Sequence, residues 1–346
     1  MKSLVFICKN IPNLIKSGGD VRALRMIKIL REEYNVTVLA TSADYGEGDV
    51  KKLGCISHWN GNLETLIKQY VGKNADLIII SGWGIAKNTI DLIRTLTSCK
   101  IIIDSIDVEF LRLQRKFEYC KGINISKEQV EKAKKNELDT YKKADAVIIV
   151  SKRDAQELMY YSFKLIELPC LFEVNFTNMV DNKRNGYIIC NWSHEPNIAS
   201  TIYLCEKILP KVNVNFYIVG KHPPEQIKKF ASNQITIRGA EYEINKFLNN
   251  MNICLAPVFY AAGMNSKIGE ALAFGIPVIT TTMGAEPYNL THLETAMVAD
   301  DDESFITAIN KVLDNDDLRL KLSSNGRVLM QNYTVDCWKK SFLEAL

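Results

Sequence analysis

The stretch APVFYAAGMNSKIGEALAFGIPVITTTMGAE, residues 256–286, contains the elements that decide the fold. It begins at the end of an apolar, strand-like run and continues into a loop that contains Gly263. Asn265 or Ser266 can then cap a helix that runs to Phe274, and a second apolar run follows. A strand, a helix and a second strand in this order predict a parallel sheet, with the start of the helix at the edge where the strands end.

The first turn of this predicted helix has the chemistry of an anion site. Unpaired backbone N–H groups and the positive end of the helix dipole favour a negative charge there, and Lys267 adds a full positive charge. Glu270 lies on nearly the same helical face, where its carboxylate can accept hydrogen bonds from two ribose hydroxyls. The stretch therefore favours a phosphate or diphosphate. An ordinary solvated Lys–Glu pair remains open from these residues alone.

The same alternation of strands and helices extends along the rest of the chain. Runs rich in Ile and Val, with helical segments between them, indicate parallel sheets that are covered on both faces. A polar stretch, 177–186, separates two such series and is the best linker candidate. We therefore expect two doubly wound α/β domains, over residues 1–174 and 175–325, with a cleft between them.

The composition is that of an ordinary soluble protein of 346 residues, with 47% hydrophobic and 24% charged residues. No apolar run is long enough to span a bilayer, and a formal net charge of +3 is too small to predict nucleic-acid binding. The opening residues, 1–10, indicate a first strand and not a signal peptide. Nine scattered cysteines without a CxxC pair favour reduced thiols in the cytoplasm over disulfides or zinc.

Five segments in this order along the chain resemble the group 1 glycosyltransferases (glycosyltransferase family four), which have the GT-B fold. That fold consists of two Rossmann-like, doubly wound domains that face each other across a cleft, and a C-terminal helix that crosses back to the first domain. The resemblance covers most of the chain and rests on residues 17–30 (SGGDVRALRMIKIL), 101–116 (IIIDSIDVEFLRLQRK), 192–212 (WSHEPNIASTIYLCEKILPKV), 216–224 (FYIVGKHPP) and 255–286.

The resemblance implies a donor site for a nucleotide-diphosphate sugar. By resemblance, Lys267 holds the diphosphate, Glu270 holds the ribose, and Gly18 and Gly19 form a glycine loop that approaches the donor from the first domain. Lys267 is also a catalytic candidate, because negative charge develops on the leaving diphosphate and a helix start with a lysine stabilises it without a metal or other cofactor. The final helix, 326–346, is expected to return to the first domain.

Three positions depart from the family pattern. Ala262 stands where the family has the first of two glutamates, and no Arg or Lys stands early in the second domain, so Lys221 is the substitute candidate for the second phosphate contact. Ile106 stands where many relatives have a histidine. Asp107 is then the second catalytic candidate, as a polar contact to sugar or acceptor, although capping of the helix that follows it remains open. Gly263, Asn265 and Ser266 complete the donor-binding set, as the loop and start of the helix.

Two further stretches allow more than one interpretation. Residues 298–305 contain an Asp-x-Asp, which suggests a cation, but capping of the next helix by Asp301 or Asp302 is favoured, and we expect no metal site. Residues 110–122 interleave basic and aromatic side chains, which is typical both of a membrane-surface face and of an ordinary solvated helix.

We therefore expect a cytoplasmic GT-B glycosyltransferase, with the inner face of the membrane as a second location. Its expected reaction is transfer of a sugar from a UDP- or GDP-sugar to a glycan or lipid-linked glycan in cell-surface polysaccharide synthesis, with retention implied by the resemblance. Two alternatives remain open: a non-catalytic GT-B subunit that binds nucleotide, glycan or a partner transferase, and a nucleotide-sugar epimerase. The oligomeric state is also open.

Overall fold

The computed structural model divides into two compact units. One unit comprises Met1–Leu171 together with Trp338–Leu346, and the other comprises Phe172–Cys337. The residues that the structure describes are 1–346 except 15–16, 45, 73–74, 121–124, 176–182 and 242. Most of the predicted linker, 177–186, thus lies outside the described residues. The domain boundaries predicted after residues 174 and 325 remain predictions.

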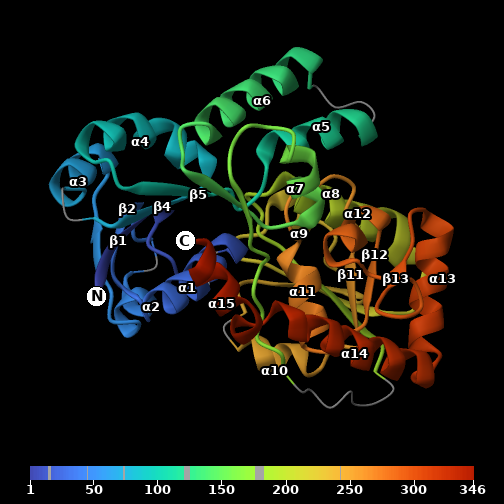
Figure 1. Ribbon diagram of the computed structural model, residues 1–346. Coiled ribbons are helices and arrows are strands. Elements are labelled where there is room, and N and C mark those ends of the chain that lie inside the picture. Colours follow the sequence, from blue (N-terminus) through green and yellow to red (C-terminus); the bar gives the residue numbers. More distant parts are fainter. Residues whose placement is uncertain (15–16, 45, 73–74, 121–124, 176–182, 242) are drawn as a thin grey trace. The chain divides into compact units, whose positions relative to one another are not determined.

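The first unit is built on a seven-stranded parallel sheet with the order β3-β2-β1-β4-β5-β6-β7 (Figure 1). The strands are β1 Lys2–Asn10, β2 Tyr34–Ser42, β3 Ile56–Trp59, β4 Leu77–Ser81, β5 Lys100–Asp104, β6 Ala146–Ile149 and β7 Leu165–Glu167. The helices are α1 Gly18–Leu30, α2 Gly48–Lys52, α3 Leu63–Tyr70, α4 Trp83–Leu96, α5 Glu109–Tyr119, α6 Lys127–Tyr141 and α7 Lys152–Leu158. Figure 1 shows α1 on one side of this sheet and α4 on the other, so its central strands are apolar on both faces.

The second unit is built on a six-stranded parallel sheet with the order β10-β9-β8-β11-β12-β13. The strands are β8 Asn185–Ile189, β9 Asn215–Val219, β10 Ile235–Arg238, β11 Ile253–Ala256, β12 Val278–Thr280 and β13 Met297–Val298. The α-helices are α8 Glu195–Tyr203, α9 Glu225–Lys228, α10 Ile244–Leu248, α11 Ser266–Ala273, α12 Thr282–Ala285, α13 Asp302–Leu313 and α14 Asp316–Met330. A π-helical turn at Leu204–Ile208 and 3-10 turns at Leu209–Lys211, Glu286–Tyr288 and Gln331–Tyr333 complete this unit.

The last helix, α15 (Val335–Ala345), crosses the division between the units, and its residues from Trp338 belong to the first unit. Within that unit Lys339 forms an ion pair with Glu32 at the end of α1, and the side chain of Phe342 is fully buried. Both an ion pair and apolar packing therefore hold the end of α15 to the first unit.

The two sheets share the doubly wound order that the sequence predicts. In each sheet the order reverses between the first strand and the fourth, that is, between β1 and β4 and between β8 and β11. Ligands of open α/β sheets bind outside the carboxyl ends of the strands at such a reversal. The loops that lead into α1 and α4 lie there in the first unit, and those that lead into α8 and α11 lie there in the second.

Candidate active site

Two helices of the second unit begin at its strand reversal, and one lysine links them. α8 begins at Glu195 after β8, and α11 begins at Ser266 after β11. The Lys267 Nζ donates to the Asn197 Oδ1 at 2.7 Å, and the Asn197 side-chain amide donates to the Asn191 backbone oxygen at 2.9 Å. The positive charge of Lys267 therefore lies between the first turns of two helices, which are themselves the positive ends of helix dipoles.

Lys267 is buried and its partner is neutral. Its exposed fraction is 8%, and within the part of the chain that the structure describes it forms no salt bridge. A buried charge is costly unless it is paired, so this arrangement favours an anion from outside the protein. The geometry of the α11 start therefore suits a phosphate.

Two buried thiols lie near Lys267 but do not neutralise it. Cys190 follows β8, and Cys254 lies on β11. Burial raises the pKa of Cys254 to about 12, and it also raises the pKa of Cys190; the positive charge of Lys267 opposes both shifts. Both thiols remain protonated at neutral pH and supply no negative charge.

The loop before α11 turns at Gly263, which has a φ of 69°. This left-handed conformation is readily available to glycine. Asn265, one of the two predicted caps, takes the N-cap position, but its side chain makes no capping hydrogen bond to the described residues. The Tyr288 hydroxyl donates to the Asn265 backbone oxygen at 2.9 Å and holds the start of the helix from the other side. Ser266 is the first residue of α11.

Glu270 and Lys221 lie at different places along the carboxyl edge of the second sheet. Glu270 is half-buried on α11, one turn after Lys267. Burial raises the pKa of Tyr187 on β8 well above its ordinary value, and the nearby Glu270 adds to the rise. Lys221 follows β9, which is separated from β11 by β8. The structure thus places Lys221 further along the edge than Lys267 and Asn197.

The glycine loop of the first unit leads directly into α1. Gly18 is the first helical residue, and the N-cap Ser17 accepts a hydrogen bond from the Asp20 backbone N–H at 3.1 Å. Gly19 follows in the first turn. Gly18 and Gly19 therefore lie at the strand reversal of the first sheet, beyond the carboxyl end of β1.

Asp107 lies between β5 and α5 and pairs with Arg112 at 3.0 Å. Its side chain is 27% exposed, and desolvation raises the pKa of its carboxyl while Arg112 opposes the rise. The N-cap of α5 is Val108, so Asp107 does not cap that helix. Asp104, just before it, is fully buried in an ion pair with Arg22 at 2.9 Å and serves the packing of α1 on the sheet.

A residue that the sequence did not suggest, Glu137 on α6, caps α5 instead. Its two carboxylate oxygens accept from the Glu109 backbone N–H at 3.1 Å and the Phe110 backbone N–H at 2.8 Å, and the Tyr141 hydroxyl donates to it at 2.6 Å. Glu137 is fully buried, and this burial raises its pKa to about 7. In the sequence it is one glutamate among many charged residues of an ordinary helix, so no signal marks it.

Asn197 is the second residue that sequence reasoning missed. Its signal is weak: an asparagine after Pro196, in the first turn of a helix. Its partner Lys267 is 70 residues away in the chain, so the pairing depends on how β8 and β11 meet in the sheet.

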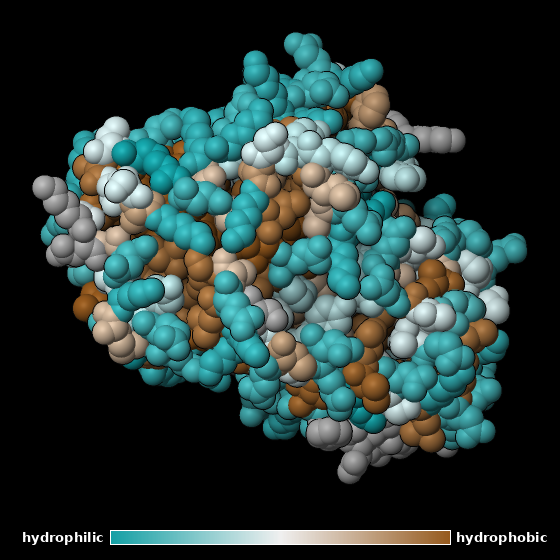
Figure 2. Space-filling model, viewed as in Figure 1, coloured by the Kyte–Doolittle hydropathy of each residue, from teal (hydrophilic) through white to brown (hydrophobic). Residues whose placement is uncertain are grey.

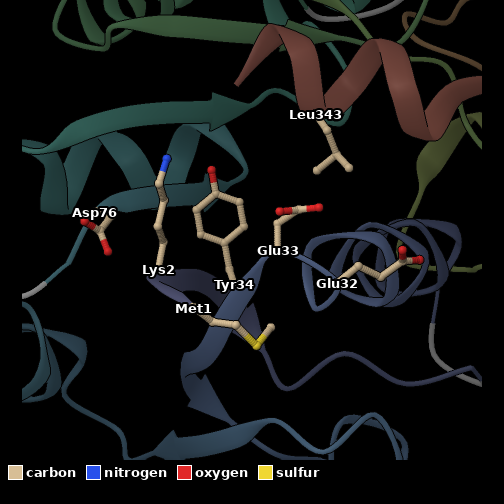
Figure 3. A pocket seen from close by; sticks show the side chains of 7 residues that line it. All are labelled: Met1, Lys2, Glu32, Glu33, Tyr34, Asp76 and Leu343. Atoms are coloured by element: carbon tan, nitrogen blue, oxygen red, sulfur yellow. The ribbon is translucent and has the colours of Figure 1, made fainter.

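A separate pocket lies at the opposite edge of the first sheet (Figure 3). Lys2 begins β1 and Tyr34 begins β2, so the pocket lies at the amino ends of these parallel strands. Figure 3 shows the lining side chains around the Tyr34 ring; they are Met1, Lys2, Glu32, Glu33, Tyr34, Asp76 and Leu343. Since ligands of such sheets bind at the carboxyl ends of strands, we do not assign the active site to it.

Asp301 caps α13, as predicted, by accepting from the Ser304 backbone N–H at 2.9 Å. Among the described residues, no group of three or more His, Cys, Asp or Glu is placed to hold a metal ion. In the same residues no helix combines the length and apolarity needed to cross a bilayer. Figure 2 shows hydrophilic residues over much of the face in view, with smaller hydrophobic areas between them.

Comparison with known proteins finds a family match within the second unit. Residues 186–315 match the model of the family "Glycosyl transferases group 1". A search of curated protein sequences finds no match.

Solved structures match most or nearly all of the chain. Sucrose-phosphate synthase from Thermosynechococcus elongatus has a TM-score of 0.77 at 14% identity, over 99% of this chain and 98% of that one. HepE of Anabaena, solved in complex with UDP and glucose, has a TM-score of 0.76 at 12% identity, over 99% of each chain. TarM of S. aureus, as a point mutant in complex with fondaparinux, alpha-GlcNAc-glycerol and UDP, has a TM-score of 0.65 at 14% identity, over 81% of this chain and 57% of that one.

At these identities the solved structures establish the fold, and the family model matches most of the second unit. The chain has the GT-B fold, and its residues 186–315 match the family of group 1 glycosyltransferases.

Proposed function

We propose that the protein transfers a sugar from a UDP- or GDP-sugar to a glycan or lipid-linked glycan acceptor in cell-surface polysaccharide synthesis. One observation supports the assignment of the donor site: the buried Lys267 has a neutral partner and lies between the starts of α8 and α11. A nucleotide diphosphate supplies the missing negative charge. The UDP in the HepE complex belongs to that protein, and its fold supports the same class of donor here.

In the proposed reaction, negative charge develops on the diphosphate as the bond to the anomeric carbon breaks. Lys267 and the two helix starts stabilise that charge, and Asn197 fixes the lysine in place. Glu270 accepts hydrogen bonds from the ribose hydroxyls, and Lys221 makes the second phosphate contact. No metal ion is needed for this stabilisation, and retention of configuration is proposed from the family resemblance alone.

The first unit is proposed to supply the rest of the site. Gly18 and Gly19 offer backbone N–H groups at the start of α1, and Asp107 contacts the sugar or the acceptor. We place the enzyme in the cytoplasm, at the inner face of the membrane when the acceptor is lipid-linked. The exposed Phe117 and Tyr119 on α5 support a peripheral membrane contact, because aromatic side chains favour the interface.

The test is thermal unfolding of the wild type and Lys267→Ala with UDP, GDP, ADP and their sugar conjugates. A ligand at 100 times its Kd stabilises the folded state by about 2.7 kcal/mol, so the preferred nucleotide is expected to raise Tm by several degrees. Lys267→Ala removes the charge that holds the diphosphate and is expected to abolish the rise. Lys311→Ala, an exposed lysine on α13, is the matched control and should keep it.

No Tm rise with any nucleotide in the wild type would refute the donor site. Incubation of the wild type with the selected sugar nucleotide then separates catalysis from binding. The enzyme is expected to hydrolyse its donor slowly without acceptor. A protein that binds the nucleotide but never releases the sugar, with or without glycan acceptors, would be the non-catalytic subunit.

A further inference from the structure

One edge of the first sheet is an open strand. β3 (Ile56–Trp59) is the outermost strand of that sheet and pairs on one side only, in parallel with β2. In the described part of the chain, the backbone of these residues makes no hydrogen bond beyond that pairing. An edge strand with unpaired N–H and C=O groups is a template for a further strand. The edge of β3 is therefore a candidate binding surface.

The other sheet edges are protected in ways that β3 is not. β7 has three residues and ends in the exposed Glu167. In the second sheet, β10 ends in the exposed Arg238, which pairs with Glu241, and β13 has two residues, one of which donates its N–H to His292 Nδ1. Short strands and charged side chains are the usual protection of sheet edges. β3 contains no Asp, Glu, Lys, Arg or Pro.

The side chains of β3 present apolar surface instead. Ile56 is 61% exposed and Trp59 is 51% exposed. Because successive strand residues point to opposite faces, these two side chains lie on opposite faces of the sheet. The His58 ring stacks on Tyr70 at the end of α3, with centroids 3.9 Å apart, and the Trp59 indole N–H donates to Glu47 at 2.6 Å. Ordered apolar surface therefore flanks the open edge on both faces.

Two helices lie beside β3 on opposite faces of the sheet. α2 precedes β3 and is joined to the end of α1 by a hydrogen bond from the Arg31 guanidinium to the Leu53 backbone oxygen. α3 follows β3 and contacts α4. Since α1 and α4 lie on opposite sides of the sheet (Figure 1), α2 and α3 do so as well. They cover the faces of the sheet at β3 and leave its edge open.

The charges on and next to these helices are paired locally. The pairs are Lys51 with Glu47 at 2.7 Å, Lys52 with Asp49 at 3.1 Å, and Lys68 with Glu64 at 2.6 Å. An uncharged strand between balanced pairs does not repel a second copy of itself. It also has no excess charge that would select an acidic or a basic partner. The surface therefore favours a copy of the same chain.

We propose that β3 is the interface of a homodimer, in which the β3 strands of two copies pair antiparallel about a twofold axis. Such an interface is isologous, so each copy supplies the same strand and the same exposed side chains. The pairing satisfies the outward backbone groups of β3 and covers Ile56 and Trp59. A stable interface buries about 800 Å² on each partner, more than a short strand offers, so the flanking surfaces of α2 and α3 take part.

This interface is separate from the proposed transferase site. β2 lies between β3 and the strand reversal at β1 and β4. Pairing at β3 therefore does not use the loops at that reversal, and the inference does not depend on the proposed function.

Sedimentation velocity of the full chain over a series of concentrations tests the dimer. The wild type is expected to reach twice the mass of one chain and to dissociate on dilution. Ile56→Lys and Trp59→Lys each bring like charges together across the twofold axis, so each is expected to raise the dimer Kd by at least about tenfold. Leu320→Lys on α14 is the matched control, because Leu320 is an apolar residue with 55% exposure in the second unit. It should dimerise as the wild type does, and all three variants should keep wild-type donor hydrolysis.

Hydrogen exchange of the wild type gives a second measurement that needs no variant. In the dimer the outward N–H groups of residues 56–59 are hydrogen-bonded, so their exchange should slow as the protein concentration rises. A wild type that stays monomeric at every concentration would overturn the proposal. A dimer whose Kd is the same in both lysine variants, and whose β3 amides exchange at the same rate at all concentrations, would also overturn it, because its interface would lie elsewhere.

Discussion

The turn after β5 and the loop after β11 each connect the end of a strand to the start of a helix, and they differ in the residues that do so. Each leaves the carboxyl end of a parallel strand, passes a residue of positive φ and enters a helix that its N-cap side chain does not cap. In the first unit the start of α5 receives the carboxylate of Glu137, and the positive φ falls on Ile106. In the second unit the start of α11 carries Lys267, and the positive φ falls on Gly263.

The difference teaches what makes a helix start a ligand site. A buried internal anion satisfies the N–H groups of α5 and makes that end structural. At α11 the neighbouring buried group is a cation with a neutral partner, so an anion from outside is favoured. Three changes would break or sharpen this comparison.

The largest expected effect is on the pH dependence of stability, through the buried Glu137. Its pKa of about 7 in the folded protein lies above its ordinary 4.5, so the unfolded chain loses the Glu137 proton first as pH rises. The free energy of unfolding should therefore fall between about pH 4.5 and 7, by roughly 3 kcal/mol from this group. Glu137→Gln cannot ionise and should lose this part of the pH dependence.

Denaturant unfolding at a series of pH values measures this effect. The exposed Glu128→Gln at the start of α6 is the control and should keep the wild-type pH dependence. Equal slopes for the wild type and Glu137→Gln over this range would contradict a buried, ionising cap.

The next change gives the α11 start an internal anion of its own. Asn197→Asp places a carboxylate beside Lys267, as Glu137 already does for α5. Nucleotide affinity is expected to fall by tenfold to a hundredfold, about 1.4–2.7 kcal/mol, because the new carboxylate competes with the diphosphate. Titration calorimetry measures it. Asn197→Ala removes the hydrogen bond to Lys267 without adding a charge, so its nucleotide affinity should fall less than that of Asn197→Asp. An equal fall in affinity in the two variants would show that the added charge is not the cause.

The smallest expected effect comes from exchanging the residue types at the two positions of positive φ. Gly263→Ala puts a Cβ at a φ of 69°, which is expected to lower the free energy of unfolding by about 1–2 kcal/mol. Ile106→Gly is expected to change stability in the opposite direction. Denaturant unfolding of both variants tests the pair, and an unchanged stability in Gly263→Ala would mean that the loop can relax.

Much of the fold follows from patterns within a few residues. The Ile- and Val-rich runs and the helical spacing predicted two doubly wound halves, and the structure confirms both sheets. The capping by Asp301 was equally predictable, since cap and amide lie three residues apart. Lys267 at the start of α11 also follows from the local order of strand, glycine, polar residues and lysine.

The side-chain partners that are distant in sequence could not be predicted from the sequence. Glu137 meets the N–H of a residue 27 positions away, Asn197 meets Lys267 over 70 positions, and Arg22 meets Asp104 over 82. Nothing local distinguishes Glu137 from the other glutamates of α6 or predicts that Ile106 has a positive φ. The sequence by itself thus determined the elements, their order and the chemistry offered at α11, because these depend on neighbours along the chain. The tertiary structure alone decided which helix start is closed by the protein's own anion and which is left with a cation, because strand order in the sheet selects the facing side chains.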